Sequence, residues 1–174
     1  MGSEMCIRDS FSLHAVKNVT TAEGGAICLN LPEPFDNAEL YKELRMMSLN
    51  CQTKDAFSKS KAGGWRYDIV GLGMKINMAD VNAAIGLAQI REYPELLKER
   101  KRVFNTYSKA FADCDWAILP PSEDGEKESS YHIYALRIKD FTEEQRDRMI
   151  DEIAKSEVAV NVHFIPMPML SFFS

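Results

Sequence analysis

The stretch that most constrains the fold is Phe11–Gly25, which reads FSLHAVKNVTTAEGG. Apolar and polar residues alternate from position 11 to position 16, and this alternation predicts a short strand that ends at Lys17. A Thr-Thr loop and a Gly-Gly pair follow, before a second apolar run at 26–29. The pattern therefore predicts two strands joined by a loop, with the lysine at the end of the first strand.

The chemical interest of Lys17 comes from its setting, because a lysine by itself is most often a solvated surface charge. Small and hydroxyl-bearing residues surround this position and can shield its amine from water. A shielded lysine amine gives up its proton more readily and can then form a Schiff base. We therefore interpret Lys17 as a candidate for covalent catalysis.

Composition limits the classes of function that fit this chain. Its 174 residues are 45% hydrophobic, enough to form a core in one domain or in two small ones. A net charge of −5 argues against a general nucleic-acid or anionic-membrane binder. The four cysteines are far apart and form no CxxC pair, which favours free thiols over a disulfide framework or a metal site. No apolar run is long enough to span a membrane, and no signal peptide is recognisable, so we expect a cytoplasmic protein.

The lysine stretch resembles the cofactor-lysine segment of the DegT/StrS-type sugar aminotransferases. The resemblance continues through GLGMKINMADVNAAIGLAQI and NVHFIPMPML, and so covers about residues 11–173 in order. It implies an α/β fold, namely the C-terminal part of a fold-type I PLP-dependent transferase (aspartate aminotransferase-like), truncated at both ends. The implied domains are a remainder of the large PLP-binding domain at 11–92 and an incomplete small α+β domain at 93–174. Residues 1–10 match nothing in the family and are interpreted as a foreign or artefactual tail.

The resemblance also implies a reaction and a set of site residues. Family members use pyridoxal 5′-phosphate (PLP) to transfer an amino group, with glutamate as the expected donor, to a nucleotide-linked keto sugar. Lys17 matches the lysine that holds the cofactor and acts as general base, and Ser12 matches a residue that hydrogen-bonds the cofactor phosphate. Asn77 matches a residue that contacts this phosphate, while many relatives carry asparagine where this chain has Lys75. We assign Lys75 to the substrate site, together with His163, whose family counterpart faces the sugar nucleotide.

The family further implies a homodimer with shared active sites. The irregular, glycine-rich stretch at 50–78 matches a loop that reaches the active site of the partner subunit in family members. The acidic partner of the cofactor ring, the ring-stacking aromatic and the main phosphate-binding turn all precede the lysine segment in the family. We therefore expect the 174 residues by themselves to be inactive.

Geometry adds one condition on the site. Ser12 and Lys17 are five positions apart, so a regular strand would point their side chains to opposite faces. The chain must turn near Val16 if both are to reach one cofactor. The Gly71-Leu72-Gly73 motif offers no competing site, because Ile76 stands where a dinucleotide-binding GxGxxG loop needs glycine.

Three alternatives to the aminotransferase remain open. Related sugar dehydratases replace the lysine with histidine, which Lys17 argues against. A non-catalytic scaffold or interaction domain of the same fold is the second alternative. A regulator that senses a ligand through PLP is the third, and it would be expected to carry a DNA-binding module that the sequence does not show.

Periodicity predicts the helices around this site. Asp36 and Glu39 have the spacing of a helix-capping box, and an apolar face follows at positions 40, 44 and 47. A pair of helices is expected at 79–113, with Pro94 ending the first. In this pair, a narrow face of small residues suits close packing in the first helix, and Phe104 and its apolar neighbours share one side of the second. The small face consists of Val81, Ala84, Ile85 and Ala88.

The last third of the chain predicts a mixed layer of strands and a helix. Strands are expected at 116–119, 130–138 and 158–165. Thr142 and Gln145 form a second capping-box pattern, which predicts a helix to about Ser156. The order strand, strand, helix, strand suggests an α+β layer with helices on one face of a sheet.

Overall fold

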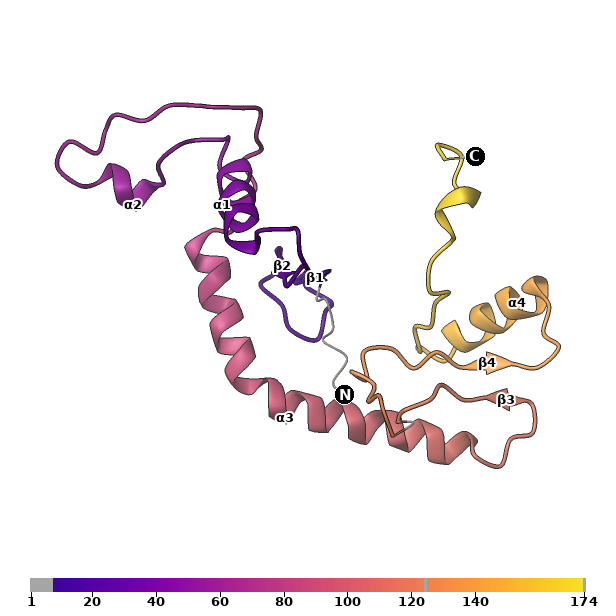
Figure 1. Ribbon diagram of the computed structural model, residues 1–174. Helices are drawn as coiled ribbons and strands as arrows, with labels where there is room; N and C mark the ends of the chain where they lie inside the picture. Colours follow the sequence, from indigo (N-terminus) through magenta and orange to yellow (C-terminus); the bar gives the residue numbers. More distant parts are fainter. Residues whose placement is uncertain (1–7, 124, 174) are drawn as a thin grey trace. The chain divides into compact units, whose positions relative to one another are not determined.

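The computed structural model describes residues 8–123 and 125–173, and it divides into two compact units (Figure 1). The first unit is Met1–Pro94 and the second is Glu95–Ser174. Both contain helices and short antiparallel strand pairs, in agreement with the expected α/β class. The two units are described separately below.

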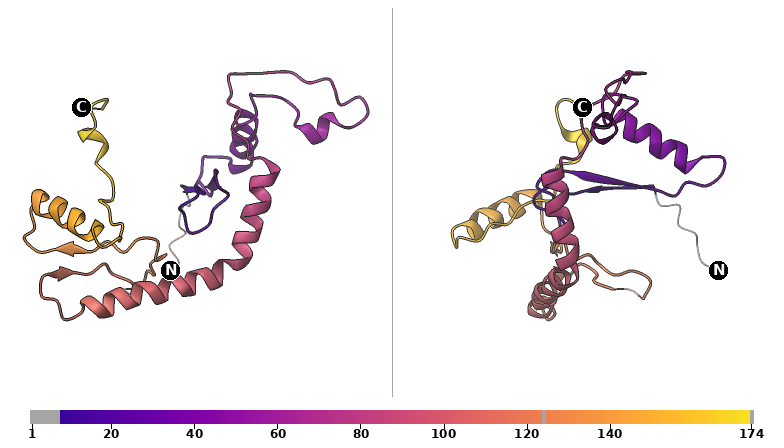
Figure 2. Two further views of the ribbon diagram at one scale, coloured as in Figure 1. Left: turned by 180° about the vertical axis from the view of Figure 1, so that it is seen from behind. Right: turned by 90° about the vertical axis from the view of Figure 1, so that its left-hand side faces the viewer.

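The first unit begins with the strand pair that leads into and out of the Lys17 region. Strand β1 (Arg8–Ser12) pairs antiparallel with β2 (Gly25–Leu29), with Ser12 opposite Gly25, and Figure 2 shows the two strands side by side. The prediction that the first strand continues to Val16 is wrong. The carbonyl of Leu13 accepts hydrogen bonds from Thr20 and Thr21, so the chain leaves the ladder directly after Ser12.

Helix α1 (Asn37–Met47) starts where the capping signal predicts. The carboxylate of Asp36 accepts hydrogen bonds from the backbone N–H groups of Ala38 and Glu39. The Glu39 side chain pairs with Lys42, one turn further along the helix. Asp36 therefore provides the cap that fixes where the helix begins.

The loop between α1 and the next long helix folds back on itself. It contains the short helix α2 (Ala56–Lys59) and two antiparallel bridges, Leu49↔Lys75 and Gln52↔Ile69. Cys51 is 5% exposed at the base of this loop. A Cβ on Gly73 would lie 2.5 Å from the Cys51 backbone nitrogen, so Gly73 is needed for close backbone packing.

Helix α3 (Asp80–Phe111) is continuous, with Pro94 inside it, so the prediction of two helices broken at that proline is wrong. A proline inside a helix removes one hydrogen bond and costs ~3 kcal/mol or more. The residues after it, Glu-Leu-Leu-Lys-Glu, are strong helix formers that offset this cost. The division between the two units falls directly after Pro94.

The buried face of the first part of α3 also differs from the prediction. Val81 is 68% exposed, and Ala84, Ile85 and Ala88 are exposed as well. The adjacent stripe faces inward instead, since Gly86 is buried and Asn82 is half-buried. The expected face of small residues is therefore displaced by one helical position from the face of α3 that packs against the rest of the first unit.

An aromatic cluster forms the core of the second unit. Phe104 is 3% exposed, and its ring lies edge-on to the rings of Tyr131 and Tyr134, with centroids 5.3 and 4.8 Å apart. Tyr107 stacks on Phe111 at 6.4 Å. These contacts confirm the prediction that the apolar residues of this helical segment share one side.

The strands of the second unit are shorter than predicted. Strand β3 (Ala117–Ile118) pairs antiparallel with β4 (Arg137–Ile138). The remainder of 130–136 and all of 158–165 are irregular, which contradicts the two longer strands expected there. A strand needs a hydrogen-bonded neighbour, and the described residues provide none for either segment.

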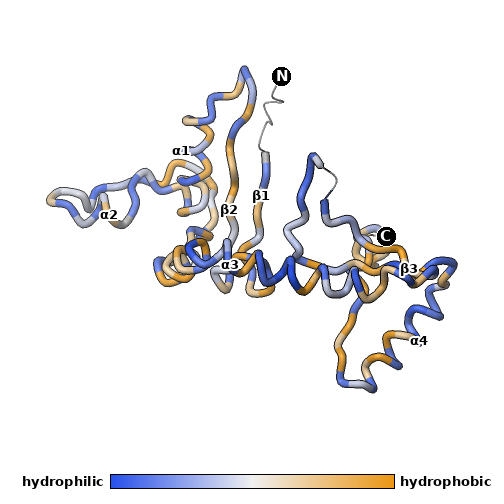
Figure 3. The backbone as a smooth tube through the Cα atoms, turned by 90° about the horizontal axis from the view of Figure 1, so that it is seen from below, coloured by the Kyte–Doolittle hydropathy of each residue, from blue (hydrophilic) through white to orange (hydrophobic). Residues whose placement is uncertain are grey.

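The last α-helix agrees with the helix predicted from the sequence. Helix α4 (Glu143–Ala154) begins with the predicted capping box, since Thr142 and Gln145 exchange side-chain and backbone hydrogen bonds. Figure 3 shows hydrophilic and hydrophobic residues alternating along α4, as expected for a helix with one apolar face. A single 3-10 turn, η1 (Met167–Met169), follows near the end of the chain.

Candidate functional site

The region around Lys17 is a closed loop, residues 13–24, which we call the lysine loop. The backbone N–H of Leu13 donates to the carbonyl of Gly24 at 2.9 Å, and the N–H of Thr21 donates to the carbonyl of Leu13 at 2.9 Å. The Thr20 hydroxyl reaches the same Leu13 carbonyl at 3.3 Å. These bonds join the two ends of the loop at a neck formed by Leu13, Thr20, Thr21 and Gly24. The residues between His14 and Thr20 project from this neck.

Thr21 is the buried anchor of the lysine loop. Its side chain is 2% exposed, and its hydroxyl donates to the carbonyl of Glu23 at 2.9 Å. Gly86 of α3 makes room for its methyl group, because a Cβ on that glycine would lie 2.7 Å from Thr21 Cγ2. The amide of Asn82, one turn earlier on α3, donates to the Thr21 carbonyl at 2.6 Å and lies 3.4 Å from the Glu23 carbonyl. The first turns of α3 therefore hold one side of the loop.

Lys17 lies on the other side of the loop, half-buried, directly after a turn at positions 15 and 16. Its backbone N–H donates to the carbonyl of His14 at 2.9 Å, which closes that turn. This is the turn near Val16 that the sequence required. Within residues 8–123 and 125–173, the Lys17 amine makes no hydrogen bond or ion pair. The arrangement fits a lysine whose amine is available to a carbonyl-bearing cofactor.

Ser12 and His14 lie at the entrance to the turn. Ser12 is the last residue of β1 and is exposed, and its hydroxyl oxygen is 3.4 Å from the backbone nitrogen of His14. His14 Nε2 is 3.4 Å from the Glu23 carboxylate on the opposite side of the loop. The Ser12 hydroxyl oxygen therefore accepts from the backbone of His14, and the His14–Glu23 pair links the two sides of the lysine loop.

Asn77 and Lys75 lie together on a different part of the first unit. The Lys75 amine donates to the side-chain oxygen of Asn77, and the backbone N–H of Asn77 donates to the carbonyl of Ser48 at 3.0 Å. Both side chains are exposed. The segment therefore lies against the C-terminal end of α1 and presents an amine and an amide side by side.

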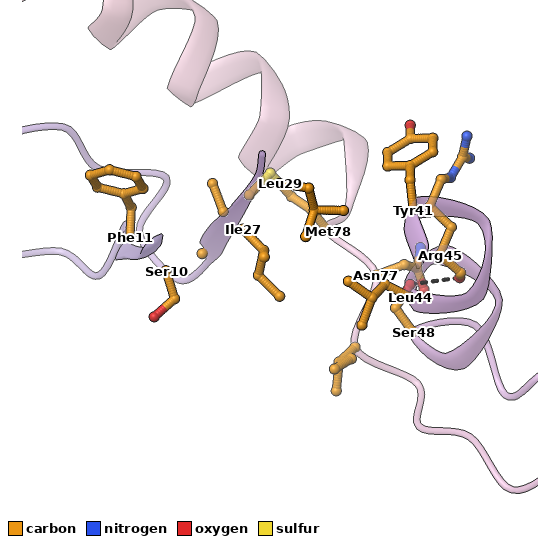
Figure 4. Close-up of a pocket in the computed structure, with 13 residues that line it drawn as sticks. Ser10, Phe11, Ile27, Leu29, Tyr41, Leu44, Arg45, Ser48, Asn77 and Met78 are labelled. Atoms are coloured by element: carbon orange, nitrogen blue, oxygen red, sulfur yellow. Dashed lines mark hydrogen bonds between the residues drawn. The ribbon is translucent and has the colours of Figure 1, made fainter. Parts of the chain in front are cut away.

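A pocket of about 460 Å³ lies between the strand pair, α1 and positions 76–78. Asn77, Tyr41 and Arg45 contribute polar groups to its lining, and Phe11 and Ile27 contribute apolar ones (Figure 4). Lys17 and Ser12 are outside this lining. Asn77 therefore lines this pocket without Lys17.

His163 belongs to the second unit. It is exposed in the irregular segment 158–165, and its ring centroid is 4.4 Å from that of Phe164. The expected strand around it is absent. Its assignment to the substrate site therefore stays a prediction, as do the roles of Ser12, Asn77 and Lys75.

Sequence reasoning missed Thr21 and Asn82, the residues that fix the lysine loop. The available signal was weak but specific, because Asn82 is an amide within a helical run of small and apolar residues. A polar group in such a run needs a hydrogen-bonding partner when it is covered.

Other kinds of site receive no support from the described residues. No group of three or more His, Cys, Asp or Glu side chains among them could hold a metal ion. Cys28, Cys51 and Cys114 are free thiols, while Cys6 lies outside the residues described. No helix within this part of the chain is long and apolar enough to cross a membrane.

The sequence matches the DegT/DnrJ/EryC1/StrS aminotransferase family over residues 4–174. An uncharacterised protein of Methanocaldococcus jannaschii is 32% identical over 166 residues, which cover 94% of this chain and 41% of that protein. A UDP-4-amino-4,6-dideoxy-N-acetyl-beta-L-altrosamine transaminase of Campylobacter jejuni is 28% identical over 163 residues, which cover 94% of this chain and 40% of that protein.

Solved structures show the same similarity. A proposed sugar aminotransferase of Streptococcus pneumoniae in its PMP-form is 42% identical, with a TM-score of 0.85 over 94% of this chain and 41% of that chain. The same protein in its PLP-form is 40% identical, with a TM-score of 0.84. This chain spans about two fifths of the length of the relatives it matches.

Proposed function

The chain belongs to the DegT/DnrJ/EryC1/StrS aminotransferase family, and from this premise we propose that it carries the lysine-bearing part of a sugar aminotransferase. Its fold is the α/β fold of the fold-type I PLP-dependent enzymes. The proposed reaction transfers an amino group from an amino acid, glutamate in our proposal, to a keto sugar linked to a nucleotide. The transaminase relative from Campylobacter jejuni supports a substrate of this class.

The Lys17 amine is the observation that carries the proposal. It is half-buried at the turn of a loop anchored at its neck and on α3, and it makes no hydrogen bond or ion pair with any described residue. PLP, when bound there, would supply a ring that withdraws electrons from the α-carbon of the amino donor. Lys17 would hold the cofactor through Nζ and, once released, would move the proton at that α-carbon.

The other site residues would bind and orient. Ser12, exposed at the end of β1, would donate its hydroxyl proton to a phosphate oxygen. Asn77 would donate a side-chain amide N–H to a phosphate oxygen from the loop at 50–78, across a homodimer interface. Its neighbour Lys75 adds a positive charge suited to a nucleotide phosphate. His163 would contact the sugar nucleotide. Shared sites of this kind need two subunits, so we propose a homodimer.

The 174 residues alone would bind the cofactor weakly and would not catalyse transfer. In family members, the acidic group that keeps the cofactor ring protonated precedes the lysine segment. Without that group the ring is a poor electron acceptor. We therefore expect no turnover when the chain is mixed with PLP, glutamate and a keto sugar nucleotide.

Chemical trapping tests the role of Lys17. The chain is incubated with PLP, treated with borohydride to fix the cofactor on any amine that holds it, digested, and analysed by peptide mass spectrometry. We expect several-fold more cofactor on Lys17 than on Lys54, which serves as an internal reference. Lys17→Arg should abolish the preferential label, while Lys54→Arg should leave it unchanged. Equal labelling of the two lysines in the unmodified chain would contradict the proposal.

A further inference from the structure

We propose that Asn82 and Thr21 are positioning residues for Lys17, through a contact that links helix α3 to the lysine loop. The inference rests on the proposed role of Lys17. Neither residue bears the cofactor. They act by holding the backbone from which the lysine projects.

The contact is a long-range one in sequence and a short one in space. The Asn82 amide donates to the Thr21 carbonyl at 2.6 Å, and the two residues are 61 positions apart. The carbonyl of Glu23 lies 3.4 Å from the same amide nitrogen. Two carbonyl groups of the loop backbone, those of Thr21 and Glu23, therefore face one side chain of α3.

The packing around Thr21 makes the contact specific. Thr21 is 2% exposed and sits against Gly86, which leaves no space for a larger side chain at either position. Ala22, the next residue, has a left-handed backbone with φ of 67°, which the chain holds between the two carbonyls that face Asn82. A non-glycine residue in this region costs about 1–3 kcal/mol and persists where surrounding contacts enforce it.

The contact reaches Lys17 through the neck of the loop. Thr21 N–H donates to the Leu13 carbonyl, and Leu13 N–H donates to Gly24, so the position of Thr21 fixes both sides of the neck. His14 follows Leu13, and its carbonyl accepts the N–H of Lys17. Loss of the hydrogen bond between Asn82 and Thr21 would therefore let the turn that carries Lys17 move. A catalytic side chain placed loosely loses rate even when its chemistry is intact.

The test replaces the amide without changing its shape. In Asn82→Asp, a carboxylate faces the two carbonyl oxygens and repels them. Asn82→Ala removes the donor without adding charge, and Asn82→Gln keeps an amide. Glu92→Gln, an exposed carboxyl-to-amide change on the same helix, is the matched control. Each variant is studied by hydrogen–deuterium exchange without cofactor and by borohydride trapping with PLP.

We expect Asn82→Asp and Asn82→Ala to accelerate exchange several-fold in peptides covering residues 13–24, while exchange in residues 95–111 stays unchanged. Both should reduce cofactor trapping on Lys17 several-fold relative to Lys54, and Asn82→Gln should recover part of it. Glu92→Gln should match the unmodified chain. If Asn82→Asp unfolds the chain as a whole, Asn82→Ala decides the result.

The possible failures can be told apart. Unchanged exchange in residues 13–24 and unchanged trapping in Asn82→Ala would overturn the positioning role. Faster exchange in that loop with full trapping on Lys17 would overturn it as well. Absence of preferential trapping on Lys17 in the unmodified chain would instead count against the proposed function, and the exchange data would still report on the contact.

Discussion

At the scale of single residues, Thr21 and Gly86 make a close contact within the first unit. The space that a side chain at position 86 would occupy is filled by the methyl group of Thr21 from the lysine loop. Two residues that share one space should respond to substitution as a pair. The sign of the effect of one change should therefore depend on the other.

We expect Gly86→Ala to destabilise the chain by about 1 kcal/mol, because overpacking outweighs the gain in helix propensity. In a Thr21→Ser background the methyl group is gone, and the same alanine should raise stability by up to ~1 kcal/mol. Chemical denaturation of the two single variants and the double variant measures this coupling. Additive effects within 0.3–0.5 kcal/mol, roughly the limit for independent sites, would show that the two positions do not share a space.

The two glycines of the Gly-Leu-Gly motif provide a second comparison at this scale. A Cβ on Gly73 would lie 2.5 Å from Cys51 N and 2.8 Å from Met47 O, whereas one on Gly71 would meet only the Cys51 side chain, at 3.5 Å and beyond. Gly73→Ala should therefore cost about 1–3 kcal/mol, and Gly71→Ala less than about 0.5 kcal/mol. Thermal denaturation of both variants checks this. A similar loss in each would mean that the motif is held by something other than backbone packing.

The candidate site shows what residue patterns can and cannot predict. The turn near Val16 is predicted by the sequence, because Ser12 and Lys17 are five positions apart and can reach one cofactor only if the chain turns between them. Alternation alone places the end of the first strand too late. The anchor on Asn82 could not be predicted, since it depends on which face of α3 meets the loop. A spacing of 61 positions carries no local signal of contact.

At the scale of elements, an ionic cluster ties the loop at 123–128 to helix α3. The Lys101 amine donates to Glu123, and lies 3.1 Å from the Glu128 carboxylate, while the Tyr131 hydroxyl contacts both glutamates. The hydrogen bond from Lys101 lowers the pKa of Glu123 from its ordinary value of 4.5, and the same contacts raise the pKa of Lys101 from 10.5. Burial raises the pKa of the Tyr131 hydroxyl.

This cluster predicts a window of pH in which the loop stays attached. The lowered pKa of Glu123 means that its contribution is present above about pH 4.5 and is lost as the pH falls through the lowered value. The raised pKa of Lys101 means that its contribution is present below about pH 10.5 and is lost as the pH rises through the raised value. NMR amide shifts of residues 125–131 should change at both limits.

Lys101→Met should detach the loop at neutral pH and remove both transitions. Lys98→Met is the control, because Lys98 pairs with Glu95 on the same helix and the pair is exposed. Persistence of both transitions in Lys101→Met would assign them to other groups.

The boundaries of helices and strands depend partly on contacts with distant segments, which local sequence patterns do not contain. The capping residues Asp36 and Thr142 mark their helices correctly, because a cap is a contact between near neighbours. Proline predicts a break at position 94, although helix formers on its C-terminal side continue α3 through it. The segments at 130–136 and 158–165 have strand-like alternation, but a strand also needs a partner, which alternation alone cannot predict.

At the scale of the whole molecule, large apolar side chains remain exposed within each unit. Leu72 is 96% exposed and Trp65 is 70% exposed in the loop at 50–78, and Phe172 is 89% exposed near the end of the second unit. The loop also exposes Tyr67, Ile69 and Val70, and a run of exposed apolar side chains marks a surface that another protein segment covers. The loop at 50–78 is the segment that our proposal places at the homodimer interface.

We expect Leu72→Asp to shift the chain from dimer towards monomer, because a charge replaces an apolar group at the proposed interface. Light scattering coupled to size-exclusion chromatography measures the average mass over a range of protein concentrations. Ala62→Asp adds the same charge at another exposed position of the loop and should have a much smaller effect. A dimer equally stable in both variants would place the interface elsewhere.

The reactivity of the buried thiol at the base of this loop reports how often the loop opens. Cys51 is 5% exposed beneath Gly71, whereas Cys28 is open to solvent. An alkylating reagent should therefore modify Cys28 at once and Cys51 only when the loop lifts from the end of α1. The delay between the two reactions, followed by mass spectrometry of the two cysteine peptides, measures how often that loop opens.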